Sequence, residues 1–153
     1  MAELGNNAKA GLVTALNGAL ADTMALYFKT KNFHWHVAGP RFHDLHLMFD
    51  EQAAQLIGTV DAIAERVRKN DEYTLTSIGT VHSETKIEDQ DDVTITADAM
   101  VAELREDNRT LRERLVQVKD EAESVGDNAT SGIVDDWIDQ AEERVWFLNQ
   151  ASK

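Results

Sequence analysis

The sequence predicts an all-α protein, a bundle of four long helices with a long crossover between the second and the third. Two observations predict the helices: the 153 residues include one proline and only eight glycines, and apolar residues recur every three or four positions in four segments. A connection of roughly 26 residues after the second segment predicts the crossover, since antiparallel neighbours need only about two to eight. No linker divides the chain, so we expect one domain over residues 1–153.

The first two helices are expected over residues 7–37 and 41–69. Ala38, Gly39 and Pro40 separate them, because proline disfavours helical backbone in the residue before it. Each segment carries an apolar stripe that we expect to face the core. The stripes are Leu12, Leu16, Leu20, Met24 and Phe28 in the first helix, and Leu45, Phe49, Leu56, Val60, Ile63 and Val67 in the second.

The crossover is expected over residues 70–96, with room for a short helix and with a solvent-facing acidic run at residues 88–92. The third helix begins after an N-cap at Thr96 and stops at Gly126, and the fourth begins near residues 127–130. A crossover makes the second and third helices parallel. The third and fourth helices also carry apolar residues that we expect to face the core. These are Met100, Leu104, Leu111, Leu115 and Val118 in the third helix, and Ile133, Val134, Trp137, Ile138, Ala141, Val145 and Leu148 in the fourth.

Composition limits the function classes. The formal net charge of −13 opposes binding to nucleic acid or to anionic lipid and favours attraction of cations. The chain has no cysteine, so disulfides and thiolate metal sites are excluded. No stretch approaches the length of a membrane span and no basic leader precedes an apolar core, so we expect a cytoplasmic protein that does not bind membranes.

The second helix carries two pairs of metal-ligand residue types. His46 and Asp50 are four residues apart, as are Asp61 and Glu65, so each pair occupies one helix face and can approach one ion. Asp50 and Asp61 are eleven residues apart, close to three turns, so both pairs point the same way. They are separated by about 16 Å along the axis, which is too far for one ion.

A second copy of the helix would bring the two kinds of ligand pair together. If it runs antiparallel about a two-fold axis, its Asp61 and Glu65 come opposite the first copy's His46 and Asp50. The dimer then carries two equivalent sites, each shared between two chains. Closed two-fold symmetry is the commonest arrangement of oligomers.

The residues also resemble a known family. The segment Lys31-Asn32-Phe33-His34-Trp35-His36-Val37-Ala38-Gly39-Pro40-Arg41-Phe42, then Leu45-His46, Phe49-Asp50-Glu51 and Asp61-Ala62-Ile63-Ala64-Glu65-Arg66, is similar to the signature of Dps-type miniferritins, whose name refers to DNA binding in starved cells. The resemblance continues in residues 127–130 and in the Val145-Trp146 stretch. It implies a ferritin-like bundle.

The resemblance also implies a function. It assigns His34, His46 and Asp50 as iron ligands from one subunit, and Asp61 and Glu65 as ligands from the facing subunit. It implies a ferroxidase that oxidises Fe(II), preferentially with hydrogen peroxide, at two irons per site. It further implies a hollow homododecamer that stores Fe(III) mineral and protects the cell from oxidative damage. Zinc or another divalent metal is an expected substitute for iron.

Other residues near these motifs have open interpretations. Trp35 is either a quencher of one-electron oxidants beside the centre or a core residue. His36, His43 and His82 are read as surface residues or as residues beside the site, and Arg66 as half of a structural salt bridge. The resemblance implies acidic iron-entry pores at the three-fold axes of the shell, near the end of the third helix and the start of the fourth. Their candidates are Asp120, Glu121, Glu123 and Asp127, each of which is alternatively a solvated helix end, with Asp127 as an N-cap.

Two function classes stay open. One is the ferroxidase and iron store; the other is a non-catalytic structural or nucleoid-associated shell of the same fold. The absence of Glu-x-x-His pairs argues against a di-iron site within one chain. The first ten residues contain only Lys9, so no basic tail is present there to neutralise phosphates, and we expect weak or no DNA binding and no nucleoid association.

Overall fold

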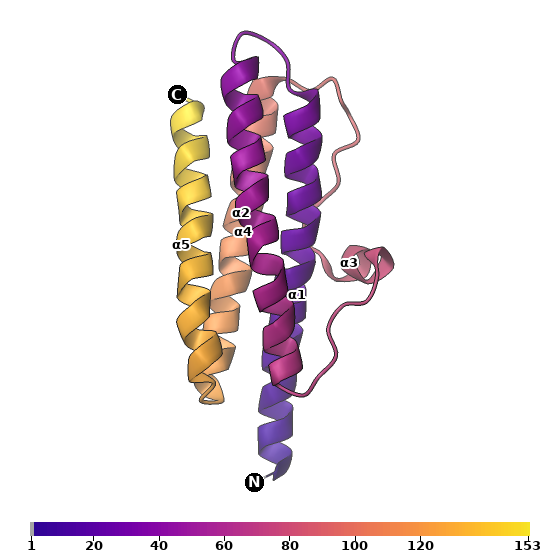
Figure 1. Cartoon of the computed structure of the whole chain (residues 1–153), viewed down its shortest axis with the longest axis vertical. Helices are drawn as coiled ribbons and strands as arrows, with labels where there is room; N and C mark the ends of the chain where they lie inside the picture. The colour runs from indigo at the N-terminus through magenta and orange to yellow at the C-terminus, as the bar shows by residue number, and fades with distance from the viewer. Residues whose placement is uncertain (1) are drawn as a thin grey trace.

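The computed structural model describes residues 2–153, and the side chains from Lys9 onward. It contains five helices, α1 (Ala2–His36), α2 (Phe42–Lys69), α3 (Ile78–Glu84), α4 (Ala97–Ser124) and α5 (Asn128–Ala151), and no strand within the described residues. The four long helices form a bundle, and the short α3 lies beside it (Figure 1). The predicted all-α bundle is therefore confirmed. Among residues 2–153, the structure has no helix with the length and apolar character of a membrane span.

The crossover sets the topology. It leaves the end of α2, passes through α3 and returns along the length of the bundle to the start of α4, so α2 and α4 run parallel (Figure 1). This confirms the expected crossover and its short helix. The other two connections are tight turns, in which Gly39 (φ 111°) and Gly126 (φ 72°) adopt left-handed backbone that suits residues without a Cβ atom.

The helix ends agree with the sequence signals. Thr96 caps α4 by accepting a hydrogen bond from the N–H of Ala99, and Asp127 caps α5 by accepting one from the N–H of Thr130. These caps satisfy backbone donors that have no partner within the helix. The predicted starts of α4 and α5 are confirmed at both positions.

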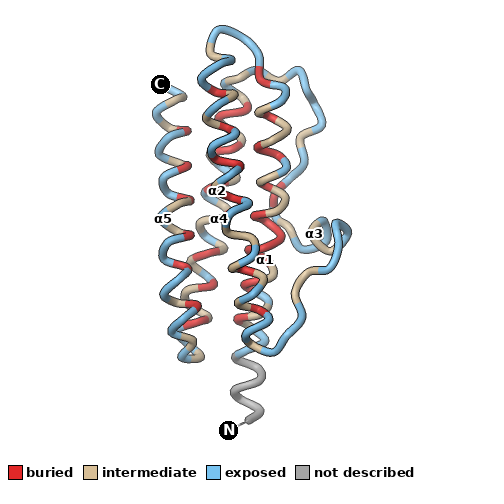
Figure 2. Tube along the Cα trace, viewed as in Figure 1, coloured by how far each residue is buried: buried red, intermediate tan, exposed pale blue. Residues whose placement is uncertain are grey.

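The core follows the inward faces of the four long helices, where Figure 2 shows the buried residues. Most predicted stripe residues are buried, but Phe28 is 66% exposed and Ile133 is 38% exposed, so these two assignments are wrong. A step of four residues overshoots one helical turn by about 40°, and four such steps from Leu12 turn Phe28 about 160° away. The buried face of α1 instead continues through Ala19, Leu26 and Phe33.

One buried acid fixes the crossover to the bundle. Asp22 of α1 is fully buried and accepts hydrogen bonds from the Thr85 hydroxyl at 2.8 Å and the Lys86 N–H at 2.7 Å. Its other oxygen lies 3.0 Å from Nε of Arg114 on α4. The Arg114 guanidinium also donates to the carbonyl of Glu84, the last residue of α3. A single carboxylate thus joins α1, α4 and the segment after α3.

A second polar layer lies between α2, α4 and α5. The Arg144 side chain is almost wholly buried, and it donates to Asn108 Oδ1 at 2.6 Å and to Gln55 Oε1 at 2.7 Å. Burial lowers the pKa of Arg144 to about 10, because the interior disfavours its charged form. The hydrogen bonds compensate part of that cost, and they fix the relative positions of the three helices.

Candidate metal centre

Two histidines at adjoining ends of α1 and α2 form the centre of the site. His34 and His46 stack with ring centroids 3.9 Å apart and an interplanar angle of 13°. Nδ1 of His34 lies 2.6 Å from the carbonyl oxygen of His46, and Nδ1 of His46 lies 2.7 Å from the carbonyl oxygen of His34. A carbonyl only accepts, so each Nδ1 carries a proton, and the tautomer with this proton has its lone pair on Nε2.

Asp50 adds a carboxylate to the two imidazoles. Its Oδ1 lies 3.8 Å from Nε2 of His34 and 2.7 Å from Nζ of Lys31. The hydrogen bond from Lys31 lowers the pKa of Asp50 below its usual range, with the nearby positive charge as a further cause. Two imidazole rings and one carboxylate therefore lie near one another, and ligands of these types suit a divalent transition metal.

Asp61 and Glu65 lie farther along the same helix. Both side chains are exposed, and neither makes a hydrogen bond or an ion pair with any side chain or backbone group from residue 9 onward. They share the outer stripe of α2 with Asp50, because residues 50, 54, 57, 61 and 65 recur every three or four positions. These two carboxylates remain free to meet a group from outside the chain.

A single copy does not complete a metal site. Over the part of the chain that the structure describes, no three His, Asp or Glu side chains are arranged to hold one ion. His34, His46 and Asp50 come together, whereas Asp61 and Glu65 lie about 16 Å away along α2 by the rise of the helix. The five predicted ligands therefore do not form one metal site within the described part of a single copy.

Exposed apolar side chains occur near these ligands along α1 and α2. Trp35 is 55% exposed, Leu47 46% and Ile57 39%, and Phe28 packs edge-on against Trp35 with ring centroids 6.1 Å apart. The exposure of Trp35 excludes its interpretation as a core residue of a single chain. Exposed apolar side chains beside carboxylates that have no partner from residue 9 onward are typical of an interaction surface.

The remaining histidines lie away from the three gathered ligands. His36, His43 and His82 are all exposed, as expected for surface residues. The Nδ1 atom of His36 interacts with Asn32 of its own helix, and Nδ1 of His43 lies 3.7 Å from its neighbour Asp44.

Arg66 is confirmed as a structural residue. Its guanidinium forms an ion pair with Asp127 at 3.1 Å and donates to the hydroxyl of Thr130 at 2.7 Å. Asn70 also donates to Asp127. Burial opposes ionisation of Asp127, but the hydrogen bonds from Thr130 and Asn70 and the charge of Arg66 outweigh it and hold its pKa at about 2. Asp127 therefore stabilises the start of α5.

The other pore candidates differ from Asp127 in their surroundings. Asp120 and Glu123 are exposed and Glu121 is half-buried near the end of α4. Glu123 lies 3.5 Å from Nζ of Lys119 one turn earlier. The single chain thus leaves Asp120 and Glu123 largely in solvent.

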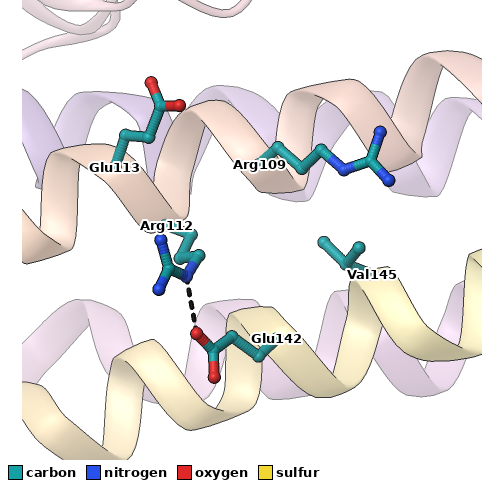
Figure 3. Close-up of a pocket in the computed structure, with 5 residues that line it drawn as sticks. All are labelled: Arg109, Arg112, Glu113, Glu142 and Val145. Atoms are coloured by element: carbon teal, nitrogen blue, oxygen red, sulfur yellow. Dashed lines mark hydrogen bonds and ion pairs between the residues drawn. The ribbon is translucent and has the colours of Figure 1, made fainter.

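A surface hollow lies between α4 and α5. It measures about 400 Å³ and is lined by Arg109, Arg112 and Glu113 of α4 and by Glu142 and Val145 of α5 (Figure 3). Arg112 is paired with Glu142 at 2.6 Å, as the dashed line in the figure marks. The hollow contains none of the residues of the metal centre.

Sequence reasoning omitted two features of the centre. Lys31 belongs to the motif around His34, and its spacing from Asp50 in the sequence does not predict that it lies one helical turn before His34 and pairs with Asp50. The exchange of hydrogen bonds between His34 and His46 involves backbone carbonyls, which side-chain spacing does not report.

Several known proteins are similar to this chain in sequence and in fold. The ferritin family, described as a ferritin-like domain, matches residues 13–152. A DNA protection during starvation protein of Brevibacillus brevis is 32% identical over 133 residues, which cover 87% of this chain and 89% of that protein. A low temperature-induced protein of Nostoc sp., itself uncharacterized, is 36% identical over 143 residues, which cover 90% of this chain and 78% of that protein.

Solved structures agree with these relatives. A Dps protein from Bacillus brevis matches with a TM-score of 0.91 and 28% identity, covering 96% of this chain and 98% of that chain. A Dps protein from Vibrio cholerae O1, described as a member of a broad superfamily of ferritin-like diiron-carboxylate proteins, matches with a TM-score of 0.89 and 27% identity, covering 96% and 92%. The family match, the curated relatives and the shared fold together show that this chain belongs to the ferritin-like family and is a Dps-type miniferritin.

Proposed function

We propose that this protein is a ferroxidase and an iron store, which oxidises Fe(II), preferentially with hydrogen peroxide, at di-iron sites shared by two copies. The observation that carries the proposal is the arrangement of the ligands. His34, His46 and Asp50 gather at one end of an exposed helix face, and Asp61 and Glu65 stand unpaired farther along that face. The family match supports iron as the metal, because a relative is described as a diiron-carboxylate protein.

A two-fold dimer would complete the site. If α2 of a second copy runs antiparallel against α2 of the first, the partner's Asp61 and Glu65 face His46 and Asp50, and the same contact is repeated at the other end. This contact would also cover Leu47 and Ile57, which are partly exposed in one copy. The proposed dimers assemble further into a hollow homododecamer, as the family resemblance implies, and the Fe(III) mineral is kept inside.

The proposed reaction balances with two irons. Each Fe(II) loses one electron, hydrogen peroxide accepts both electrons, its O–O bond breaks, and two protons complete two molecules of water. Imidazole and carboxylate ligands with open positions suit non-haem iron. Because both electrons leave together, no hydroxyl radical is released. Trp35, next to His34 in sequence and exposed on the same face, is our candidate for quenching a stray one-electron oxidant.

Iron substrate must also reach the inside of the proposed shell. We propose that Asp120, Glu121 and Glu123, near the end of α4, line an acidic entry path. Asp127 stands closest to the family pattern, but its carboxylate already binds Arg66, Thr130 and Asn70. Asp127 therefore does not bind iron in the proposed entry path, and only its negative charge would attract the cation.

The proposal is tested by loading the purified protein anaerobically with Fe(II) and adding peroxide. We expect fast oxidation at about two Fe(II) per peroxide with little trapped radical, in a particle whose mass light scattering has fixed. A variant with His46→Ala and Asp50→Asn should lose rapid oxidation and keep its assembly. His43→Ala is the matched control, because His43 is an exposed histidine of the same helix. Unchanged oxidation by the double variant would refute the site.

A non-catalytic shell that associates with DNA is the second candidate function, which the name of the DNA protection during starvation protein of Brevibacillus brevis supports. The net charge of −13 opposes it, since a highly acidic surface repels phosphates. We expect no band shift of DNA with purified protein at low salt and neutral pH. A clear shift, together with slow Fe(II) oxidation, would favour the shell.

A further inference from the structure

Lys31 stands between two residues of the proposed site. Its Nζ lies 2.7 Å from Oδ1 of Asp50 and 5.7 Å from the centroid of the Trp35 ring. Only 22% of the Lys31 side chain is exposed, whereas 52% of the Asp50 side chain is exposed. The ammonium group therefore has two neighbours that favour a cation, a carboxylate and an aromatic face.

The position of Lys31 conflicts with a bound metal ion. The Oδ1 atom that Lys31 holds is the same atom that faces Nε2 of His34 at 3.8 Å. A divalent ion between His34 and Asp50 would stand close to the ammonium group, and the two positive charges repel each other. Metal binding at this carboxylate therefore competes with the ion pair.

An ordinary salt bridge between α1 and α2 is the simpler explanation of the contact. A pair with a half-exposed carboxylate contributes little to stability, because water and salt screen it. A purely structural pair would also leave metal affinity unchanged when it is removed. The two explanations therefore differ in what the loss of Lys31 does to metal binding.

We propose that Lys31 is a displaceable counter-ion of the metal centre, which occupies Asp50 when no metal is bound and moves toward the face of Trp35 when a divalent metal binds. Lys31 is thus a positioning residue that sets the affinity of the site. This inference rests on the proposed function, in which iron is a substrate that must bind and then leave. Because the Lys31 ammonium group competes with the metal ion for the Asp50 carboxylate, the site releases its ion more readily than a site without this lysine.

The test is calorimetric titration of the assembled protein with Zn²⁺ alone, using wild type, Lys31→Met and Lys31→Arg. The methionine keeps an apolar stem and removes the charge. We expect Lys31→Met to bind Zn²⁺ about fivefold more tightly, the fold-change that corresponds to an exposed ion pair of about 1 kcal/mol. Lys31→Arg, which keeps the charge, should bind like wild type or more weakly. Lys69→Met is the matched control, because Lys69 is an exposed lysine at the far end of α2.

The outcomes separate this inference from the function on which it rests. Equal or weaker Zn²⁺ binding by Lys31→Met, in a variant with the mass and helix content of wild type, would overturn the role of Lys31 alone. If the variant with His46→Ala and Asp50→Asn bound Zn²⁺ as tightly as wild type, the metal centre itself would be misplaced and both proposals would fall. Tighter binding by Lys31→Met that the His46 and Asp50 changes abolish would support both.

Discussion

His34 and His46 each donate an Nδ1–H hydrogen bond to the backbone carbonyl of the other, at 2.6 and 2.7 Å. This exchange joins the last turn of α1 to the first turns of α2 across the tight turn at Gly39. It fixes both ring orientations and leaves both Nε2 atoms available. Hydrogen bonds of this kind orient metal-binding histidines in many sites.

The exchange predicts the proton positions on both rings. Neutron diffraction from crystals grown at neutral pH should show deuterium on Nδ1 of His34 and His46, because a carbonyl accepts only from a protonated nitrogen. His43, which has no backbone carbonyl partner among the described hydrogen bonds, serves as the comparison. Deuterium on Nε2 alone in either His34 or His46 would show that the ring is oriented differently.

Asp127 is predicted to stabilise the fold through the start of α5. Asp127→Ala removes the N-cap and leaves Arg66 without its acid, at a cost of about 1–2 kcal/mol in the free energy of unfolding. We expect the thermal midpoint to fall by about 3–6 °C at neutral pH. Asp120→Ala, which removes an exposed acid from the end of α4, should change the midpoint little.

The same interaction has a defined pH dependence. The folded state holds the pKa of Asp127 at about 2, below its usual value, so its contribution is complete above about pH 4 and is lost as the pH falls toward 2. The difference in thermal midpoint between wild type and Asp127→Ala should therefore become smaller as the pH falls from about 4 to about 2. A constant difference down to about pH 2 would mean that the charge of Asp127 contributes nothing.

Asp22 is predicted to hold the crossover in place. Asp22→Ala leaves the partly buried Arg114 guanidinium without its acid and the Lys86 N–H without its acceptor, at a cost of about 3–5 kcal/mol. Hydrogen exchange should accelerate most in residues 78–87, which comprise α3 and the segment after it that Asp22 binds. Uniform acceleration over all helices would instead indicate a general loss of stability.

A substitution at Gly18 tests the ion pair between Asp22 and Arg114 by displacing the arginine instead of removing the acid. Arg114 lies against Gly18, and a Cβ atom there would overlap its guanidinium, so Gly18→Ala should displace Arg114 and produce a similar but smaller exchange pattern. Gly132→Ala is the matched control, since its helix position has open space around it and alanine favours helices.

Periodicity predicted most of the fold because the long helices are amphipathic and their ends carry strong signals. Thr96 and Asp127 cap their helices as expected, and the length of the connection alone predicted the crossover. The stripe through Phe28 was wrong because a constant step of four drifts around the helix. The buried charge of Arg144 was not expected, since its partners Asn108 and Gln55 are distant in sequence.

The candidate site was predictable in part. Four-residue spacing places His46 with Asp50 on one face, and the motif around His34 added the third ligand. The Lys31 contact was not predictable from spacing, because it depends on how α1 packs against α2. The carbonyl bonds of the two histidines depend in the same way on the turn between the helices.

Complementation between two inactive variants tests the central claim most directly, that each site is shared by two copies. One variant carries His46→Ala and Asp50→Asn, and the other carries Asp61→Asn and Glu65→Gln. Each alone should lack rapid Fe(II) oxidation. Co-expressed in equal amounts, they should recover about a quarter of the wild-type rate, because half of randomly formed dimers contain both variants and each of these has one intact site of two. A mixed assembly no more active than either variant, or full activity of the Asp61 and Glu65 variant alone, would contradict the account.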